Sequence, residues 1–144
     1  MKIYLDTCCY CRPFDEPEQE KISNERNVIG AILDLSPIMN YVIVGSLAIR
    51  TEIDEINDTE KHLAVTNFYK SAVNEYIQLT GSIIEQGRTM SQMAGLGGFD
   101  GLHLAFAEAA GADYLLTVDN KFEKASGKLN LKVKVINPLK FWGV

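Results

Sequence analysis

The clearest structural pattern in the sequence is Phe99-Asp-Gly-Leu-His-Leu-Ala-Phe-Ala-Glu-Ala-Ala-Gly-Ala-Asp-Tyr-Leu-Leu-Thr-Val-Asp119. Residues 99–110 are rich in alanine and predict a helix, with apolar side chains on a common face at Leu102, Ala105, Phe106 and Ala109. Gly111 ends this helix, residues 114–118 predict a buried strand, and Asp119 follows directly. A helix that leads at once into a buried strand is typical of a parallel sheet in an α/β fold.

The first part of the chain shows the same alternation. Lys2–Leu5 predicts a short strand that stops at Asp6, and residues 22–35 predict a crossover helix that ends before Pro37. Residues 41–45 form an uninterrupted apolar run, which is the pattern of a parallel strand covered on both faces. The N-terminal segment is therefore expected to form a strand, helix, strand unit.

Further helices and one more strand complete the expected order. Ser46 and Thr59 are suited to cap the first two of three helices, over residues 47–57, 59–78 and 82–94. Gly95-Leu-Gly-Gly98 ends the third helix, residues 133–136 predict the last strand, and residues 138–142 predict a short terminal turn. The whole pattern predicts a three-layer α/β/α sandwich with a central, mainly parallel sheet.

Length and composition favour one domain. The chain has 144 residues, of which 47% are hydrophobic, so we expect residues 1–144 to form a single domain with one core. No stretch approaches the roughly 20 uninterrupted apolar residues of a membrane helix. Met1-Lys2 leads directly into a strand pattern and not into a signal peptide. The expected protein is soluble and cytoplasmic, without membrane contact.

The charges are distributed unevenly. The net charge of −5 argues against binding of nucleic acid through overall electrostatics. Residues 120–144, however, carry six lysines and one acidic residue, whereas the rest of the chain carries 8 basic and 18 acidic residues. The C-terminal segment can therefore offer a basic strip beside an acidic body, with solvated surface lysines as the alternative.

Three cysteines, Cys8, Cys9 and Cys11, lie in one short segment. Neighbouring cysteines rarely have the geometry of a disulfide, so we expect reduced thiols. A zinc site would need a further soft or imidazole ligand. The two histidines, His62 and His103, fall within expected helices and lack ligand-type spacing, so a zinc site is not predicted.

Four acidic residues are candidates for chemistry, and two of them directly follow strands. Asp6 and Asp119 come at the carboxyl ends of expected parallel strands, where open α/β sheets form their functional crevice. Asp100 opens an apolar helix, and Glu52 lies among Ile49, Ile53 and Ile56 in a semi-buried position. Each acid taken alone also suits a turn, a helix cap or a solvated helix face.

A common location for these acids would require a cation. Carboxylates in one crevice raise each other's pKa unless a positive charge compensates them. Oxygen ligands without clustered histidine or cysteine favour Mg²⁺, Mn²⁺ or Ca²⁺ over zinc. The sequence therefore predicts a hard divalent cation bound by the acids.

Four segments resemble, in order, the motifs of PIN domains, as found in the toxin half of many bacterial and archaeal toxin–antitoxin pairs. They are Ile3-Tyr-Leu-Asp-Thr7, Ser46-Leu-Ala-Ile-Arg-Thr-Glu52, Phe99-Asp-Gly-Leu-His-Leu-Ala105 and Gly111-Ala-Asp-Tyr-Leu-Leu-Thr-Val-Asp-Asn-Lys-Phe122. The resemblance covers essentially the whole chain. The chain departs from it at Cys8, where many relatives have Asn or Ser, and at Gly101, where Ala is common.

The resemblance implies a PIN-like fold and a metal-dependent endoribonuclease that hydrolyses RNA phosphodiester bonds. It implies Mg²⁺ or Mn²⁺ at Asp6, Glu52, Asp100 and Asp119, with the three aspartates as principal ligands and Glu52 as ligand or water-orienting base. The expected partners are an RNA substrate, an antitoxin protein and a second copy of the chain.

Other residues are expected to support this site. Thr7 and Thr117 are candidates to steady the two aspartates that follow strands. Arg12 and Arg50 are expected near the rim, and three lysines are candidates for RNA backbone contacts or for simple surface solvation: Lys121, Lys124 and Lys128. An apolar segment from Thr59 to Ala94 suits either core packing or a homodimer or antitoxin surface; its members are Leu63, Phe68, Tyr69, Val73, Tyr76 and Ile77.

Two other functions fit part of the pattern. A catalytically silent PIN-like module that binds RNA or protein would be indicated by loss of one of the core acids, and none is lost. A nucleotide-binding module would use the glycines of residues 95–98, but this run follows a helix and not a strand. Metal-dependent hydrolysis of RNA is therefore the favoured hypothesis.

Overall fold

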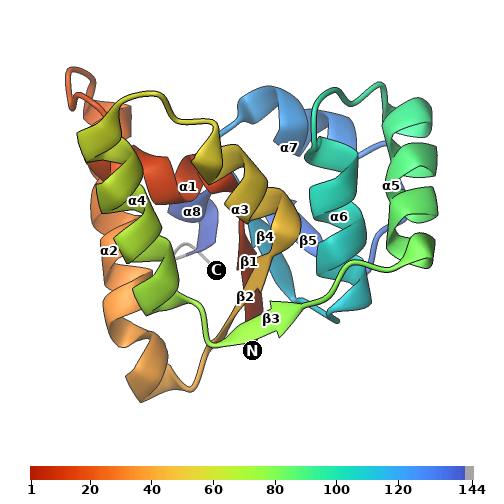
Figure 1. The fold of residues 1–144 in the computed structure, drawn as a ribbon, viewed down its shortest axis with the longest axis horizontal. Helices are drawn as coiled ribbons and strands as arrows, with labels where there is room; N and C mark the ends of the chain where they lie inside the picture. The colour runs from red at the N-terminus through yellow and green to blue at the C-terminus, as the bar shows by residue number, and fades with distance from the viewer. Residues whose placement is uncertain (142–144) are drawn as a thin grey trace.

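Five parallel strands form one sheet in the order β3-β2-β1-β4-β5 (Figure 1). The structure is a computed structural model that describes residues 1–141. The strands are β1 (Lys2–Leu5), β2 (Val42–Ser46), β3 (Glu75–Ile77), β4 (Tyr114–Leu116) and β5 (Lys134–Ile136). Strand β1 is central, because Ile3 pairs with Ile43 on one side and with Tyr114 on the other.

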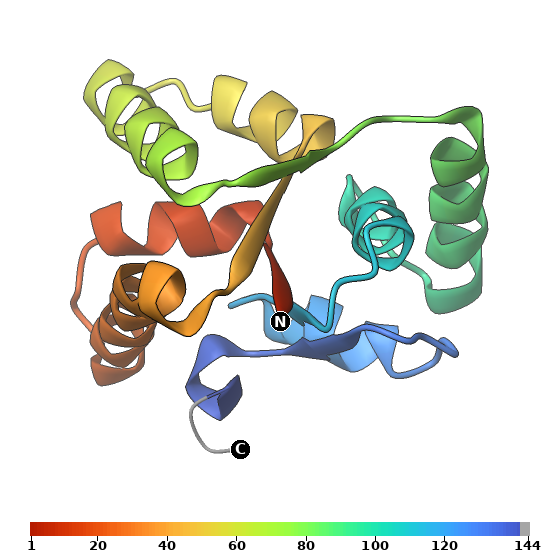
Figure 2. The ribbon, with the colours of Figure 1, turned by 90° about the horizontal axis from the view of Figure 1, so that it is seen from below.

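Helices cover both faces of the sheet, which confirms the predicted three-layer α/β fold. Helices α1, α2 and α4 lie on one side, whereas α5 and α6 lie on the other (Figure 2). The helices are α1 (Thr7–Cys11), a 3-10 helix η1 (Arg12–Phe14), α2 (Glu20–Met39), α3 (Leu47–Asp54), α4 (Thr59–Ala72), α5 (Gly81–Ala94), α6 (Asp100–Ala109), α7 (Asn120–Ser126) and α8 (Pro138–Phe141).

The core lies on both faces of the three central strands. Ile3, Tyr4 and Leu5 are completely buried, as are Ile43 and Val44 on the next strand. Strands covered on both faces need continuous apolar sequences, which is the pattern predicted for residues 41–45 and also present at residues 3–5. Among residues 1–141, no helix combines the length and apolar composition that a membrane span requires.

The prediction that the first long helix ends before Pro37 is wrong, because α2 continues to Met39. A proline lacks the N–H group that would bond to the carbonyl four residues earlier, here that of Leu33. The hydroxyl of Ser36 donates to this carbonyl at 2.9 Å instead. The helix then ends at Asn40, which adopts the left-handed conformation with φ 56°. A local side-chain bond therefore compensates for the proline.

The predicted helix over residues 59–78 is also too long. Helix α4 ends at Ala72, and β3 follows as an edge strand paired with β2. Asp58, and not Thr59, caps α4 by accepting the N–H of Lys61. Strand β3 has only three residues, and its side chains alternate between half-buried and exposed. Such a short strand depends on its pairing partner, so its own sequence carries little signal.

The ends of several other elements differ by a few residues from the prediction. The helix that begins at Leu47 ends at Asp54, and the strand that begins at Tyr114 ends at Leu116. The expected terminal turn contains α8, and Trp142 lies outside the described residues. The short helices α1 and α7 were not predicted; they begin directly after Asp6 and Asp119. Both strand-end aspartates are therefore also helix caps.

Candidate metal centre

Asp6 occupies the centre of the carboxyl edge of the sheet. Its backbone N–H donates to the carbonyl of Leu116 at 2.9 Å and so ties the end of β1 to the end of β4. Oδ1 accepts the N–H of Thr7, and Oδ2 accepts the hydroxyl hydrogen of Thr117 at 2.8 Å. The side chain of Asp6 is only 8% exposed. This carboxylate is therefore held rigidly on both oxygens.

Glu52 reaches the same edge from helix α3. Ser46 begins this helix as predicted, because its Oγ accepts the N–H of Ile49 at 3.3 Å. Glu52 is half-buried, and its Oε1 accepts the hydroxyl hydrogen of Thr7 at 2.7 Å. Thr7 was expected to steady an aspartate that follows a strand, but its hydroxyl supports the glutamate.

His103 completes a compact group with these two acids. Its Nε2 lies 2.5 Å from Oε1 of Glu52 and 3.5 Å from Oδ1 of Asp6, and the residue is completely buried. Among the described residues, Asp6, Glu52 and His103 form a group whose candidate metal-ligand atoms all lie within 4.8 Å of one another. The prediction that no histidine clusters with the acids is therefore wrong.

The packing of distant elements explains why His103 was missed. The sequence placed His103 within an expected helix, and the structure buries it in α6. Its contact with Glu52, however, depends on how α6 packs against α3, which the helical period does not specify. A histidine three residues after Asp100, on the same face of the helix, was the one available signal.

The pKa values of this pair move in the directions that favour charge. Burial alone raises the pKa of Glu52, but the hydrogen bond and charge of His103 lower it below its ordinary value. Burial alone lowers the pKa of His103, but its hydrogen bond with Glu52 and the charges of the nearby acids raise it above its ordinary value. The negative field at this edge thus favours positive charge.

Asp100 lies at the start of α6, and the charges of the other three acids raise its pKa. Burial raises its pKa first, and the charge of Asp6 raises it further. His103 opposes this rise, while Asp119 and Glu52 add to it, so that the pKa of Asp100 reaches about 6. The four predicted acids therefore interact electrostatically at one edge of the sheet.

Asp119 is exposed and lies outside the compact group. Its Oδ1 accepts the N–H groups of Lys121 and Phe122 at 3.0 and 3.2 Å, so it caps α7. Its own N–H donates to Oγ1 of Thr117. Asp119 therefore has the helix-cap role that the sequence had allowed as an alternative. Its Oδ2 has no hydrogen-bond partner within residues 1–141.

Cys8 also contacts the site. Its Sγ lies 3.3 Å from Oδ2 of Asp6 and 3.4 Å from Oγ1 of Thr117. All three cysteines are free, as predicted, with Cys9 buried and Cys11 half-buried. A weakly polar thiol therefore contacts Asp6 at the position where, by the resemblance described above, many PIN domains have Asn or Ser.

Both arginines that were expected near the rim have acidic partners. Arg12 lies 3.2 Å from Asp15 and 3.3 Å from Glu25, and Arg50 lies 3.7 Å from Asp54. The side chain of Arg12 is only 19% exposed. This pairing makes Arg12 part of the structural framework and weakens the case for a contact between Arg12 and RNA.

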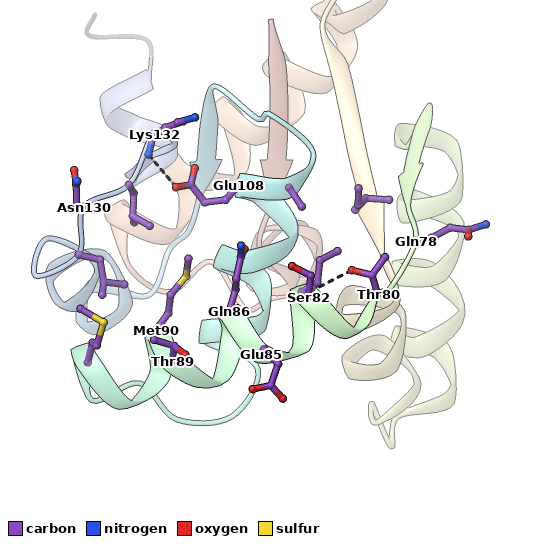
Figure 3. A pocket seen from close by; sticks show the side chains of 16 residues that line it. Gln78, Thr80, Ser82, Glu85, Gln86, Thr89, Met90, Glu108, Asn130 and Lys132 are labelled. Carbon is purple, nitrogen blue, oxygen red and sulfur yellow. Dashed lines mark hydrogen bonds between the residues drawn. The ribbon is translucent and has the colours of Figure 1, made fainter.

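A separate cavity of ≈ 750 Å³ lies between α5, α6 and the loop at residues 129–132 (Figure 3). Its lining is mainly apolar and includes Ile83 and Met90. The carboxylate of Glu108 faces this region but accepts the N–H groups of Lys132 and Val133 at 3.0 Å each. None of the four predicted acids lines the cavity, so it is distinct from the candidate metal centre.

Comparison with known proteins bears on the fold. No protein-family model and no curated protein matches the sequence. Solved structures do match: FitAcB from Neisseria gonorrhoeae has a TM-score of 0.58 and 16% identity over 95% of this chain and 98% of that chain. The structure of FitAB bound to an IR36 DNA fragment has a TM-score of 0.61 and 17% identity over 94% of each chain. The chain has the PIN-domain fold.

The residues at the carboxyl edge of this PIN-domain fold fit a metal ion. Asp6 and Glu52 offer carboxylate oxygens within a few ångströms of each other, and a third acid, Asp100, has its pKa raised to about 6 partly by their charge. Mutual repulsion of this kind is relieved by a bound cation. The donor set consists mainly of oxygen, with one imidazole and one thiol beside it.

Proposed function

We propose that this PIN-domain chain is a Mg²⁺- or Mn²⁺-dependent endoribonuclease that hydrolyses RNA phosphodiester bonds. The observation that carries the proposal is geometric: carboxylate oxygens of Asp6 and Glu52 lie within 4.8 Å of each other at the carboxyl edge of the sheet. The charges of these acids also help to raise the pKa of Asp100. That edge is where α/β folds place their ligands. Hard oxygen donors in this arrangement favour Mg²⁺ or Mn²⁺.

Asp6, Asp100 and Asp119 are the proposed principal ligands, and Glu52 is the proposed ligand or water-orienting base. When bound, the cation supplies Lewis-acid stabilisation of phosphoryl charge and lowers the pKa of a water molecule. The helix-cap role of Asp119 is compatible with this role, because both capping bonds use Oδ1 and leave Oδ2 without a partner within residues 1–141.

The surrounding residues orient the acids. Thr117 holds Oδ2 of Asp6, and Thr7 holds Oε1 of Glu52. Side chains fixed in this way lose little conformational freedom when an ion or substrate binds, so the site is preorganised. Metal binding would also reduce the negative charge that repels an RNA backbone. We therefore expect RNA binding, as well as cleavage, to require the cation.

Residues 1–144 are proposed to act as a single cytoplasmic domain, with an antitoxin protein and a second copy of the chain as partners. The resemblance of the four motifs to toxin-type PIN domains supports this assignment. Leu63 and Tyr76 support a protein contact, because they remain 60% and 52% exposed. Other members of that apolar segment pack against the core, as Tyr69 does with 4% exposure.

A catalytically silent PIN-like module that binds RNA or protein is the second candidate. Asp119 favours it, because this residue is exposed and its carboxylate already serves as a helix cap. Such a module would keep the fold and its surface but would not cleave RNA under any metal condition.

The test is cleavage of labelled structured and unstructured RNAs by the full chain with Mn²⁺, Mg²⁺ or EDTA. An Asp100→Asn variant removes a proposed ligand, whereas Asp34→Asn makes the same chemical change at an exposed position on α2. Cleavage that requires metal, persists in Asp34→Asn and disappears in Asp100→Asn supports the nuclease. Equal cleavage by all three proteins refutes it, and metal binding without any cleavage favours the silent module.

A further inference from the structure

His103 links the candidate metal centre to a buried chain of hydrogen bonds. Its Nδ1 lies 2.6 Å from the hydroxyl oxygen of Tyr4, and that hydroxyl lies 2.7 Å from Oγ of Ser46. Tyr4, Ser46 and His103 are all completely buried. At the other end of the ring, Nε2 lies 2.5 Å from Oε1 of Glu52. The imidazole therefore spans the distance between a core tyrosine and a carboxylate of the site.

The donors and acceptors of this chain determine which ring nitrogen carries hydrogen. Ionised Glu52 can only accept, so a bond of 2.5 Å requires hydrogen on Nε2 of His103. If the ring is neutral, the hydroxyl of Tyr4 donates to Nδ1. If the ring is charged, Nδ1 donates to Tyr4, which then donates to Ser46. Both arrangements give the Tyr4 hydroxyl and both ring nitrogens of His103 a partner, and both have Nε2 donating to Glu52.

We propose that His103 is a positioning residue that orients Glu52 and does not itself bind the metal ion. This inference rests on the proposed function. A nitrogen that carries hydrogen has no lone pair for a cation, and Nδ1 faces Tyr4 on the other side of the ring.

The same contacts determine which oxygen of Glu52 is available. Oε1 receives hydrogen bonds from both His103 and Thr7. Oε2 has no hydrogen-bond partner in the described part of the chain. Two donors from different elements thus hold one oxygen in place and leave the other for an ion or a water molecule, which is how supporting residues tune a metal site.

A direct-ligand role for His103 makes the opposite prediction about its ring. The closeness of its Nε2 to Asp6 and Glu52 is compatible with ligation if the ring gives up that hydrogen. Nitrogen-15 NMR of the histidine rings distinguishes the two roles in the full chain, with and without saturating Mg²⁺. His62 serves as an internal reference, because its side chain is 36% exposed and lies on α4.

The expected spectrum shows hydrogen on Nε2 of His103 before Mg²⁺ is added and after saturation. If the metal-free chain carries hydrogen on Nδ1 alone, the positioning role is overturned, regardless of whether the chain binds Mg²⁺. Loss of the Nε2 hydrogen on saturation also overturns it and makes His103 a ligand.

A matched pair of variants tests the consequence for the site. His103→Gln keeps an N–H donor near the position of Nε2, whereas His103→Met keeps similar bulk without a donor. We expect the methionine variant to bind Mn²⁺ about 10–100-fold more weakly by calorimetry, and the glutamine variant to recover much of that loss. Equal affinity in the wild type and both variants overturns the positioning role.

A variant that changes the protein less is needed in case the His103 variants do not fold. The wild type provides the reference affinity for the metal ion. If thermal unfolding shows that the His103 variants do not fold, Tyr4→Phe removes only the hydroxyl that supports Nδ1. It is expected to weaken Mn²⁺ binding, and unchanged affinity counts against the chain of bonds. Failure of the wild type to bind Mn²⁺ or Mg²⁺ at all refutes the proposed function itself, an outcome distinct from failure of the variants alone.

Discussion

Thr117 donates its hydroxyl hydrogen to Oδ2 of Asp6 across 2.8 Å, although the two residues lie 111 positions apart in the sequence. The contact exists because β1 and β4 are neighbours and end at the same edge of the sheet. The same Oγ1 accepts the N–H of Asp119 at 3.1 Å. One threonine therefore connects the two aspartates that follow strands.

Thr117→Val is expected to weaken Mn²⁺ binding by about 10–100-fold, because it removes the hydroxyl that orients Asp6 without changing the size of the side chain much. Calorimetric titration of the variant with Mn²⁺ measures the loss. Thr117→Ser keeps the hydroxyl and serves as the control, with affinity near that of the wild type. If valine and serine behave alike, the hydroxyl does not position Asp6.

Metal affinity is expected to fall as the pH drops below about 6. The pKa of Asp100 is raised to about 6, so the residue is a carboxylate at pH 7.5 and largely a neutral acid at pH 5. A neutral acid must lose its proton before it can bind a cation, which weakens apparent affinity at low pH. Mn²⁺ dissociation constants measured from pH 5 to 8 test this, with Asp100→Asn expected to show a flatter profile. An identical pH profile in both proteins contradicts the assignment.

Removing the charge of Asp100 is expected to stabilise the metal-free protein. Because the folded-state pKa lies above the ordinary value, the folded form binds this proton more tightly than the unfolded form. Stability from this group is therefore present at low pH and is lost as the pH rises through about 6. In EDTA at pH 7.5, Asp100→Asn should raise the free energy of unfolding by about 1 kcal/mol, after allowance for solvent screening of a half-buried side chain.

Urea unfolding at pH 7.5 and pH 5 measures this effect. The advantage of Asp100→Asn should shrink at pH 5, where the wild-type residue is largely protonated. Mn²⁺ should stabilise the wild type more than the variant, because only a ligand that binds the folded state adds stability. A variant less stable than the wild type in EDTA would show that Asp100 is held by favourable contacts and is not repelled by its neighbours.

Glu25 is expected to be critical for stability and not for metal binding. It is completely buried on α2, where Oε2 accepts the side-chain N–H of Asn137 at 2.6 Å and Oε1 lies 3.3 Å from Nε of Arg12. Glu25→Ala leaves the side-chain N–H of Asn137 without its acceptor and leaves Arg12 with Asp15 as its acidic partner, so it should lower the free energy of unfolding by about 3 kcal/mol. Urea unfolding tests this beside Glu20→Ala, an exposed position on the same helix. If both variants lose the same free energy of unfolding, the buried contacts of Glu25 add no more stability than an exposed glutamate does.

Gly101 is expected to be required by the contact between α5 and α6. A methyl group at this position would overlap the side chain of Ser91 and the carbonyl oxygen of Gly87. Gly101→Ala should therefore lower the free energy of unfolding by about 1–3 kcal/mol. The sequence showed this glycine only as a departure from the alanine that is common in PIN domains, whereas the structure shows that it permits close packing.

Gly30→Ala, also within a helix, is expected to change the free energy of unfolding in the opposite direction. Apart from the adjoining residues and the helix's own backbone, no heavy atom lies within 4 Å of a methyl group built at Gly30 on α2. Alanine should therefore raise the free energy of unfolding by about 0.5–1 kcal/mol. Thermal unfolding of both glycine variants compares the two sites. Stabilisation by alanine at both positions would rule out close packing at Gly101.

Local patterns in the sequence predicted the fold class and pointed to the edge of the sheet where the candidate metal centre lies. Residues 2–5 indicated a short strand, and residues 41–45 and 114–118 indicated buried strands. The structure has strands at Lys2–Leu5, Val42–Ser46 and Tyr114–Leu116. Asp6 and Asp119 follow two of these runs, and parallel strands end at the same edge. Both inferences need only the order and spacing of residues along the chain.

Contacts between distant segments were decided by the tertiary structure alone. Strand β3 forms because β2 offers an edge to pair with. Helix α2 continues beyond Pro37 because the hydroxyl of Ser36 donates a hydrogen bond to the carbonyl of Leu33. His103 bonds to Glu52, 51 positions away, only because α6 packs beside α3. Sequence periodicity specifies which face of a helix is buried. It does not specify which side chain that face meets, because the meeting depends on how every element packs around the shared core.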